Sequence, residues 1–129
     1  MPVEMLHGSD ESIADFLARF RATVLDLFFG SPEKRDDAEY VLLEIINNAV
    51  EHGHRFNADK KIRVEWTVHP AQLAVHIEDE GNGFASRPPF SEPPAGTPRG
   101  RGLWSIQADV RHLAFNEKGN RVNVIFERG

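Results

Sequence analysis

The sequence contains no cysteine among its 129 residues. This absence excludes a disulfide framework, a thiol nucleophile and a cysteine-ligated zinc site. The six histidines do not show the spacing that is typical of a metal site. Two of them, His52 and His54, flank a glycine at the end of a predicted helix, and we assign them to the surface rather than to a ligand set.

Long apolar runs and an excess of basic residues are also lacking. No apolar run approaches the length of a membrane span, and residues 1–10 lack the basic and apolar regions of a signal peptide. We therefore expect no membrane association and a cytoplasmic protein. The formal net charge of -5 does not indicate direct binding to nucleic acid. A hydrophobic content of 40% over 129 residues predicts one domain, residues 1–129, with a real core.

The spacing of apolar residues predicts two helices in the first half of the chain. The first begins at Ser9 or Asp10 and continues to Gly30, whereas the second begins with Ser31 as its cap and Pro32 as its first residue. The second helix is expected to end near residue 52, with Gly53 following in the left-handed conformation. The apolar stripe of the first helix consists of Ile13, Phe16, Leu17, Phe20, Val24, Leu27 and Phe28.

The pattern then changes to the period of two that is typical of strands. Residues 62–68 and 73–77 predict a hairpin joined through His69 and Pro70. Residues 113–115 and 122–126 predict a second hairpin, which follows a short helix over residues 102–110. Each strand has one apolar face, so helices should cover one side of the sheet. The predicted fold is an α/β (α+β) two-layer sandwich with a mixed, mostly antiparallel sheet.

Proline is concentrated in one segment between the two hairpins. Residues 85–99 contain five of the eight prolines, at positions 88, 89, 93, 94 and 98. A stretch of this length without periodicity is usually a functional lid or a disordered segment. The alternative is a semi-rigid spacer of polyproline type without a function.

The second helix carries polar residues that are suited to metal and proton chemistry. Glu44, Asn48 and Glu51 are spaced at i, i+4 and i+7 and therefore share a face. A carboxamide oxygen can ligate Mg²⁺ without neutralising it, and a neighbouring carboxylate can accept a proton. On this helix alone, an ordinary solvated face is the simpler interpretation.

Two glycine motifs flank the proline-rich segment. The first, Asp79-Glu80-Gly81-Asn82-Gly83-Phe84, directly follows a predicted strand. Its carboxylate can accept a hydrogen bond from a ligand amino group, and its glycines allow the backbone to approach a flat ring. The second, Gly100-Arg101-Gly102-Leu103, precedes a predicted helix, whose free N–H groups favour phosphate. Taken singly, a tight turn and a flexible hinge explain these motifs equally well.

In this order, the three motifs resemble those of the Bergerat-fold ATPases, which include gyrase, the heat-shock chaperone family, sensor histidine kinases and mismatch-repair ATPases. The resemblance covers residues 36–129. Within the superfamily, the chain is most similar to the anti-sigma-factor serine kinases. The similarity rests on Asn48-Ala49-Val50-Glu51-His52-Gly53, on the motif that begins at Asp79, and on Arg99-Gly100-Arg101-Gly102-Leu103.

The resemblance implies roles for individual residues toward ATP and Mg²⁺. Asn48 would hold the Mg²⁺, Glu44 would act as the base for the attacking hydroxyl, and Asp79 would bond the adenine amino group. Gly81 and Gly83 would shape the base pocket, where Phe84 is also placed. The other implied nucleotide-binding residues are Asn47 and Glu51 along the helix, Gly100, Arg101, Gly102 and Leu103 around the phosphates, and Arg99, which with Arg101 would neutralise charge on the transferred group.

Three features depart from the family pattern. Trp104 replaces a smaller apolar residue or Phe next to the phosphate loop. Gly119-Asn120-Arg121 stands where many members have Gly-Thr, which would remove a hydroxyl contact and lower nucleotide affinity. The N-terminal strand of many such kinases corresponds at best to Val3–His7, and a homodimer built on that edge depends on it.

The leading interpretation is an ATP-dependent serine/threonine kinase of the partner-switching type. It would bind a sigma factor or a comparable client, and it would phosphorylate an anti-anti-sigma-factor protein. One alternative is the catalytic domain of a histidine kinase. Three expectations argue against it: the first helix is a single span and not a helical hairpin, no histidine lies in a phosphoacceptor context, and the chain has no room for a dimerisation domain. Another is a non-catalytic adaptor that binds ATP and sequesters a partner.

Overall fold

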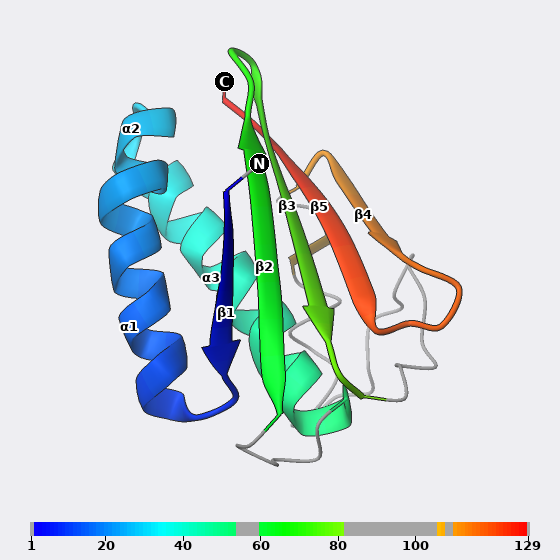
Figure 1. Cartoon of the computed structure of the whole chain (residues 1–129). Helices are drawn as coiled ribbons and strands as arrows, with labels where there is room; N and C mark the ends of the chain where they lie inside the picture. Colours follow the sequence, from blue (N-terminus) through cyan, green and yellow to red (C-terminus); the bar gives the residue numbers. More distant parts are fainter. Residues whose placement is uncertain (1, 54–59, 82–105, 108–109, 129) are drawn as a thin grey trace, which may run out of the picture.

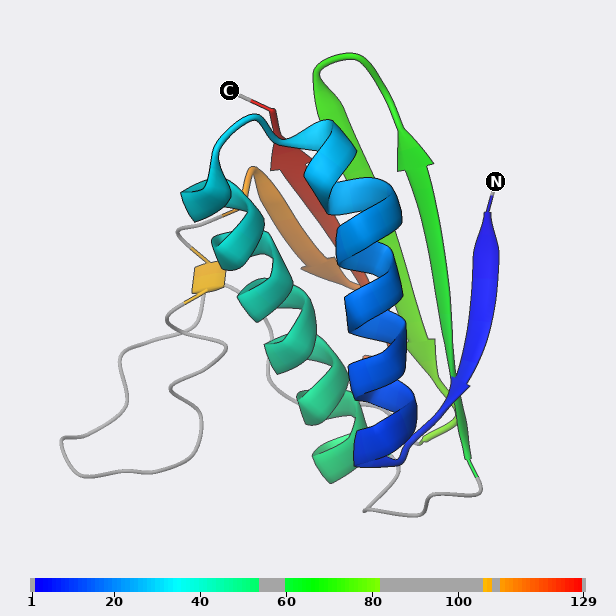
Figure 2. The same ribbon diagram turned by 90° about the vertical axis from the view of Figure 1, so that its left-hand side faces the viewer.

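The fold consists of one sheet with helices packed against one of its faces (Figures 1 and 2). The computed structural model describes residues 2–53, 60–81, 106–107 and 110–128. In these residues the elements follow the order strand, helix, helix, hairpin, hairpin. The first strand, which the resemblance placed at best at Val3–His7, is present. The two helices and the two hairpins follow in the predicted order, whereas the predicted loop and most of the predicted short helix between the hairpins lie outside the described residues.

The sheet has five strands in the spatial order β1-β2-β3-β5-β4. All four pairings are antiparallel. The predicted two-layer sandwich is therefore confirmed, and none of the described strands forms the parallel pair that a mixed sheet would contain. The strands are β1 Val3–His7, β2 Lys61–Val68, β3 Gln72–Asp79, β4 His112–Phe115 and β5 Arg121–Glu127.

The N-terminal strand β1 forms one edge of the sheet. It pairs with β2 over its whole length, from Val3 opposite Glu65 to His7 opposite Lys61. Leu6 points into the core, whereas Met5, its neighbour, is 52% exposed. This alternation is expected for a strand with one buried face. The edge on which a homodimer was predicted is therefore present, and the homodimer itself stays a prediction.

The first helical rod runs from Asp10 to Phe28 without a break. It comprises α1 (Asp10–Phe20), the π-helical turn η1 (Arg21–Leu25) and α2 (Asp26–Phe28). Ser9 is its N-cap, and its hydroxyl accepts a hydrogen bond from the Ser12 N–H at 3.2 Å. This cap satisfies one of the free donors at the helix start, as the sequence predicted.

The π-helical turn corrects one predicted core position. The N–H of Asp26 bonds to the carbonyl of Arg21, five residues earlier, so the turn holds more residues than an α-helical turn. As a result, the buried face moves along the sequence. Leu25 is fully buried, whereas Leu27, which the α-helical period placed in the stripe, is 80% exposed.

The second rod provides most of the helical contribution to the core. It comprises α3 (Pro32–Asn48) and a second π-helical turn, η2 (Ala49–Gly53). The hydroxyl of Ser31 caps α3 by accepting from the Lys34 N–H at 3.4 Å, and Pro32 occupies the first turn, as predicted. Helical structure extends through Gly53, one residue beyond the predicted end.

The core lies between the two rods and the covered face of the sheet. Its fully buried side chains come from both layers and include Leu25, Val41, Ile46, Ile62, Leu73, Val75 and Val124. Of the predicted helix over residues 102–110, only positions 106, 107 and 110 are described, and Ile106 is fully buried in this core. The helices in the described part of the chain are too short or too polar to cross a membrane.

Candidate functional site

The first part of the site is the C-terminal end of α3. Glu44 and Asn48 are both half-buried and lie one turn apart on the flank of the helix. Asn48 is the last α-helical residue, and the π-helical turn starts at the next position, Ala49. Single π-helical turns inside helices are frequent at functional sites, because they redirect side chains without ending the helix. Glu51 lies within this turn and is also half-buried.

The second part is the C-terminal end of β3. Asp79, its last residue, is only 9% exposed and is the one buried charged residue in the described part of the chain. One carboxylate oxygen of Asp79 accepts a hydrogen bond from the Gly81 N–H at 2.6 Å. A buried carboxylate is costly unless hydrogen bonds satisfy it, so its position here indicates a specific role. Gly81 is buried beside it.

These two parts lie at the same end of the molecule. The turn η2, which continues α3, packs against β3, and Figure 1 shows the end of β3 close to the end of α3. The carboxamide of Asn48 and the carboxylate of Asp79 therefore come from a helix end and a strand end that are more than 30 residues apart in the sequence.

The comparison with protein families favours a ligand site over a solvated surface at this end of the molecule. Residues 8–126 match the model of the histidine kinase-like ATPase domain. The chain belongs to the histidine kinase-like ATPase family. The match also includes the first helix, which lies outside the residues that carried the resemblance in the sequence. A comparison with curated proteins found no match.

Membership of the histidine kinase-like ATPase family supports ATP binding by this chain. The described donors fit such a ligand. Asp79 offers a buried acceptor for an amino group, and Asn48 offers a hard oxygen of the kind that Mg²⁺ prefers. Among the described residues, no group of three or more His, Asp or Glu side chains is placed to hold a metal ion by itself.

Asn47, the neighbour of Asn48, lies on the other flank of α3. It is exposed and lines a groove between α1 and α3 with a volume of about 410 Å³. The groove has a mainly apolar floor, and its other lining residues are Asp10, Ile13, Ala14, Leu17, Ala18, Glu39 and Leu43. The structure thus places Asn47 toward α1, whereas its predicted contact with the nucleotide stays a prediction.

Most of the predicted nucleotide contacts, to the base as well as to the phosphates, lie outside the described residues. This holds for Gly83, Phe84, Arg99, Gly100, Arg101, Gly102 and Leu103, as well as for Trp104 and the proline-rich segment over residues 85–99. The described site therefore consists of the helix end, the end of β3 and the turn that follows β4.

That last turn contains a residue whose role the sequence does not reveal. In the sequence, Asn120 is notable only because it stands where many family members have threonine, so that a hydroxyl contact to the nucleotide would be lost. Its side-chain Nδ2 in fact donates to the main-chain carbonyl of Asp79 at 3.2 Å, and its own carbonyl accepts from the Asp79 N–H at 2.9 Å. The sequence signal available for it is the pair of asparagines, Asn116 and Asn120, around the turn glycine Gly119.

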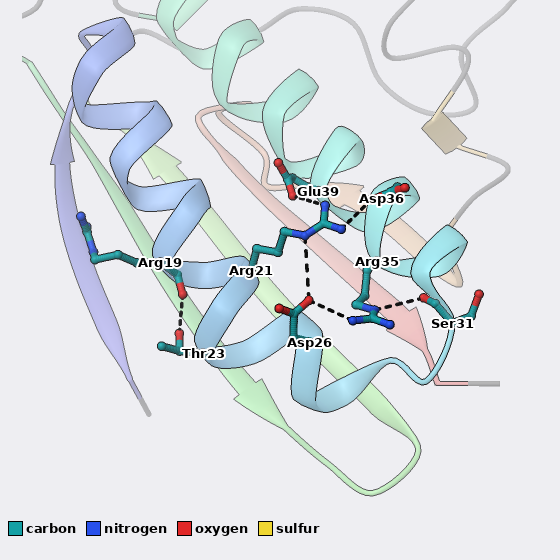
Figure 3. Close-up of polar contacts among 8 residues, drawn as sticks. All are labelled: Arg19, Arg21, Thr23, Asp26, Ser31, Arg35, Asp36 and Glu39. Atoms are coloured by element: carbon teal, nitrogen blue, oxygen red, sulfur yellow. Dashed lines mark hydrogen bonds and ion pairs between the residues drawn. The ribbon is translucent and has the colours of Figure 1, made fainter.

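The largest ionic network of the described residues lies away from this site. Figure 3 shows Arg21, in η1, between the carboxylates of Asp36 at 2.8 Å and Glu39 at 2.7 Å, both in the first half of α3. Hydrogen bonds to Glu39 and then to Asp36 raise the pKa of Arg21 above its usual value. Asp26 joins the network through Arg21 at 3.9 Å, and Arg35 in turn pairs with Asp26 at 3.3 Å. These contacts tie the two rods together and are a structural feature.

Proposed function

We propose that the chain is an ATP-dependent serine/threonine protein kinase of the partner-switching type. Its client would be a sigma factor or a comparable protein, and its substrate would be an anti-anti-sigma-factor protein. The histidine kinase-like ATPase family gives the coarser part of this proposal, namely an ATP-binding domain with kinase-like chemistry. The serine/threonine specificity rests on the motifs around Asn48 and Asp79, which resemble those of the anti-sigma-factor kinases.

The observation that carries the proposal is the convergence of three side chains at one end of the sandwich. Glu44 and Asn48 lie one turn apart at the end of α3, and Asp79 lies at the end of the strand against which the following turn packs. In the proposal, these three side chains serve as the proton acceptor, the metal ligand and the base-recognising carboxylate of one site. Phosphoryl transfer needs mainly such positioning and charge stabilisation.

Each of these residues has a definite task in the proposal. The carboxamide oxygen of Asn48 ligates Mg²⁺, and the carboxylate of Asp79 accepts a hydrogen bond from the amino group of adenine. The carboxylate of Glu44 orients the attacking hydroxyl and takes its proton. Bound Mg·ATP supplies the phosphoryl group. The N–H of Gly81 holds one oxygen of Asp79, which fixes the direction of that carboxylate.

Phosphorylation of the substrate protein provides the switch. A phosphoserine or phosphothreonine carries roughly two negative charges at neutral pH. These charges break a packed interface through repulsion and desolvation, so the phosphorylated protein leaves and the kinase is free to hold its client. The net charge of -5 on this chain increases that repulsion.

The test is a transfer assay with radiolabelled ATP, Mg²⁺ and a candidate substrate. The candidate is the anti-anti-sigma-factor protein whose gene lies nearest to the gene of this protein. We expect an acid-stable label on a serine or threonine of the substrate. An acid-labile, alkali-stable label on a histidine would favour the histidine-kinase alternative. Nucleotide that is bound without transfer to either would favour the adaptor.

Two variants with the same chemical change make the assay specific. Glu44→Gln removes the proposed base, whereas Glu33→Gln alters an exposed glutamate in the first turn of the same helix. Only the first should reduce transfer. Equal rates in both variants and the parent would contradict the role of Glu44 in the proposed reaction.

A further inference from the structure

The turn between β4 and β5 is held by an unusually complete set of asparagine hydrogen bonds. The side-chain oxygen of Asn116 accepts from three consecutive main-chain N–H groups, those of Gly119 at 2.7 Å, Asn120 at 3.0 Å and Arg121 at 3.1 Å. Gly119 has a positive φ of 84° and is buried, which permits this tight path. One side chain therefore fixes the whole turn.

The turn is connected to the site by a chain of donors that runs in one direction. Asn116 Nδ2 donates to Asn120 Oδ1 at 2.8 Å, and Asn120 Nδ2 donates to the main-chain carbonyl of Asp79 at 3.2 Å. Because Asn116 uses its Oδ1 for the turn, its Nδ2 must face Asn120. This sets the orientation of the Asn120 amide, which leaves Nδ2 toward Asp79.

The same turn also extends the sheet at the end of β3. The register of β3 and β5 ends at Glu78 opposite Arg121. The Asp79 N–H then donates to the Asn120 carbonyl at 2.9 Å, so main-chain and side-chain bonds from one residue hold both polar groups of the Asp79 backbone. On its other side, Asp79 is paired with Ile62 of β2. Its backbone is fixed from both neighbours.

We propose that Asn120, supported by Asn116, is a positioning residue for recognition of the nucleotide base. It acts through Asp79: by holding the backbone at the end of β3, it directs the buried carboxylate to the amino group of adenine. This inference rests on the proposed ATP binding and adds to it the element that sets base selectivity. The expectation that an asparagine at this position removes a hydroxyl contact and lowers nucleotide affinity stays a separate prediction.

The sharpest test is Asn116→Asp, which keeps the turn but reverses the donor chain. An aspartate retains an acceptor for the three N–H groups and loses the Nδ2 donor to Asn120. The amide of Asn120 should then rotate to offer its Nδ2 to the new carboxylate at position 116, and the bond to the Asp79 carbonyl is lost. A second variant, Asn120→Ala, removes the same bond directly.

The readout compares ATP with inosine triphosphate, which has a carbonyl oxygen in place of the adenine amino group. We expect both variants to bind ATP about 3- to 10-fold more weakly, the value of one neutral hydrogen bond. Their affinity for inosine triphosphate should equal that of the parent. Asn123→Ala is the matched control on β5, because its side chain contacts His76 and Arg121 on the open face of the sheet and not Asp79.

Each outcome has a defined meaning. A parent protein that binds neither nucleotide contradicts the proposed ATP binding itself. A parent that binds ATP, together with variants that bind ATP as tightly as the parent, overturns only the positioning role. Affinities for the two nucleotides that fall in parallel also overturn it, because a general loss of structure has no base preference. Circular dichroism on both variants identifies any that fails to fold, and the other variant then decides.

Discussion

Arg21 in the π-helical turn and Glu39 in α3 are joined by an ion pair of 2.7 Å. The same guanidinium also pairs with Asp36 at 2.8 Å, so one residue of the first rod holds two successive turns of the second (Figure 3). Glu39 also lines the groove between α1 and α3. The packing of the two rods, and hence the position of the helix that carries Asn48, depends partly on this contact.

We predict that Arg21→Gln lowers the melting temperature measurably, whereas Arg111→Gln does not. Arg111 makes one ion pair at 3.4 Å with Glu127, and both side chains are more than half exposed. Such isolated surface pairs contribute little, whereas networks contribute more. Because the pKa of Arg21 is raised, the stability that its charge contributes is lost only as pH rises beyond the usual arginine range. The difference in melting temperature between the two variants should therefore be constant across neutral pH. Raising the salt concentration should reduce it. Equal melting temperatures for both variants would show that the network does not stabilise the fold.

A second prediction tests the register of β1. Leu6 is 3% exposed and Met5 is 52% exposed on the same strand. Leu6→Ala should cost about 2–5 kcal/mol of unfolding free energy, because it removes buried apolar contacts and leaves a cavity. Met5→Ala should change it by less than about 0.5 kcal/mol. Urea unfolding of both variants measures this, and the reverse order of costs would place the strand one residue out of register.

Much of this fold was predictable because each element carries a local signal. The caps at Ser9 and Ser31 and the alternation along β3, β5 and the first part of β2 depend on neighbouring residues alone, and these predictions are confirmed. Val68, at the end of β2, was expected on the apolar face and is 52% exposed. The five-residue strand β1 is too short to give a clear alternation, and its stability comes from pairing with β2, which is far away in the sequence. Leu27 was misplaced because a π-helical turn leaves no mark in the spacing of apolar residues.

The candidate site was predictable for a different reason. Asn48 and Asp79 follow from residue types in a fixed order, and that order indicated the family before any contact was known. Asn120 could not be assigned in this way, because its role consists of contacts to residues 116 and 79. Residue 79 comes next to Asn120 only when the chain is folded. Hydrogen bonds across strands are decided by register, which single residues do not encode.

A third prediction concerns stabilisation by nucleotide. Mg·ATP at about 100 times its dissociation constant should raise the free energy of unfolding by roughly 2.7 kcal/mol, because the folded state alone binds it.

Asp79→Asn should weaken ATP binding about 10- to 100-fold, since an amide whose oxygen keeps the bond to Gly81 turns its NH₂ toward the adenine amino group. Asp37→Asn, at an exposed position of α3, is the matched control. Thermal unfolding with and without nucleotide is the measurement, and an unchanged midpoint for the parent at millimolar Mg·ATP would contradict ATP binding.

The last prediction separates Glu44 from Asn48, which lie one helical turn apart and have different tasks. Glu44→Gln keeps the size and most hydrogen bonds of the side chain but cannot take a proton. It should leave the affinity for Mg·ATP nearly unchanged and slow transfer by roughly 10²- to 10⁴-fold. A loose transition state would place the effect at the lower end, because positioning then matters more than removal of the proton.

Asn48→Ala should instead lose the Mg²⁺-dependent part of nucleotide binding, and transfer with it. Calorimetry and a transfer assay on both variants give the two quantities. The assignment of roles fails if Glu44→Gln transfers phosphate at the parental rate. It also fails if Asn48→Ala binds Mg·ATP as tightly as the parent does.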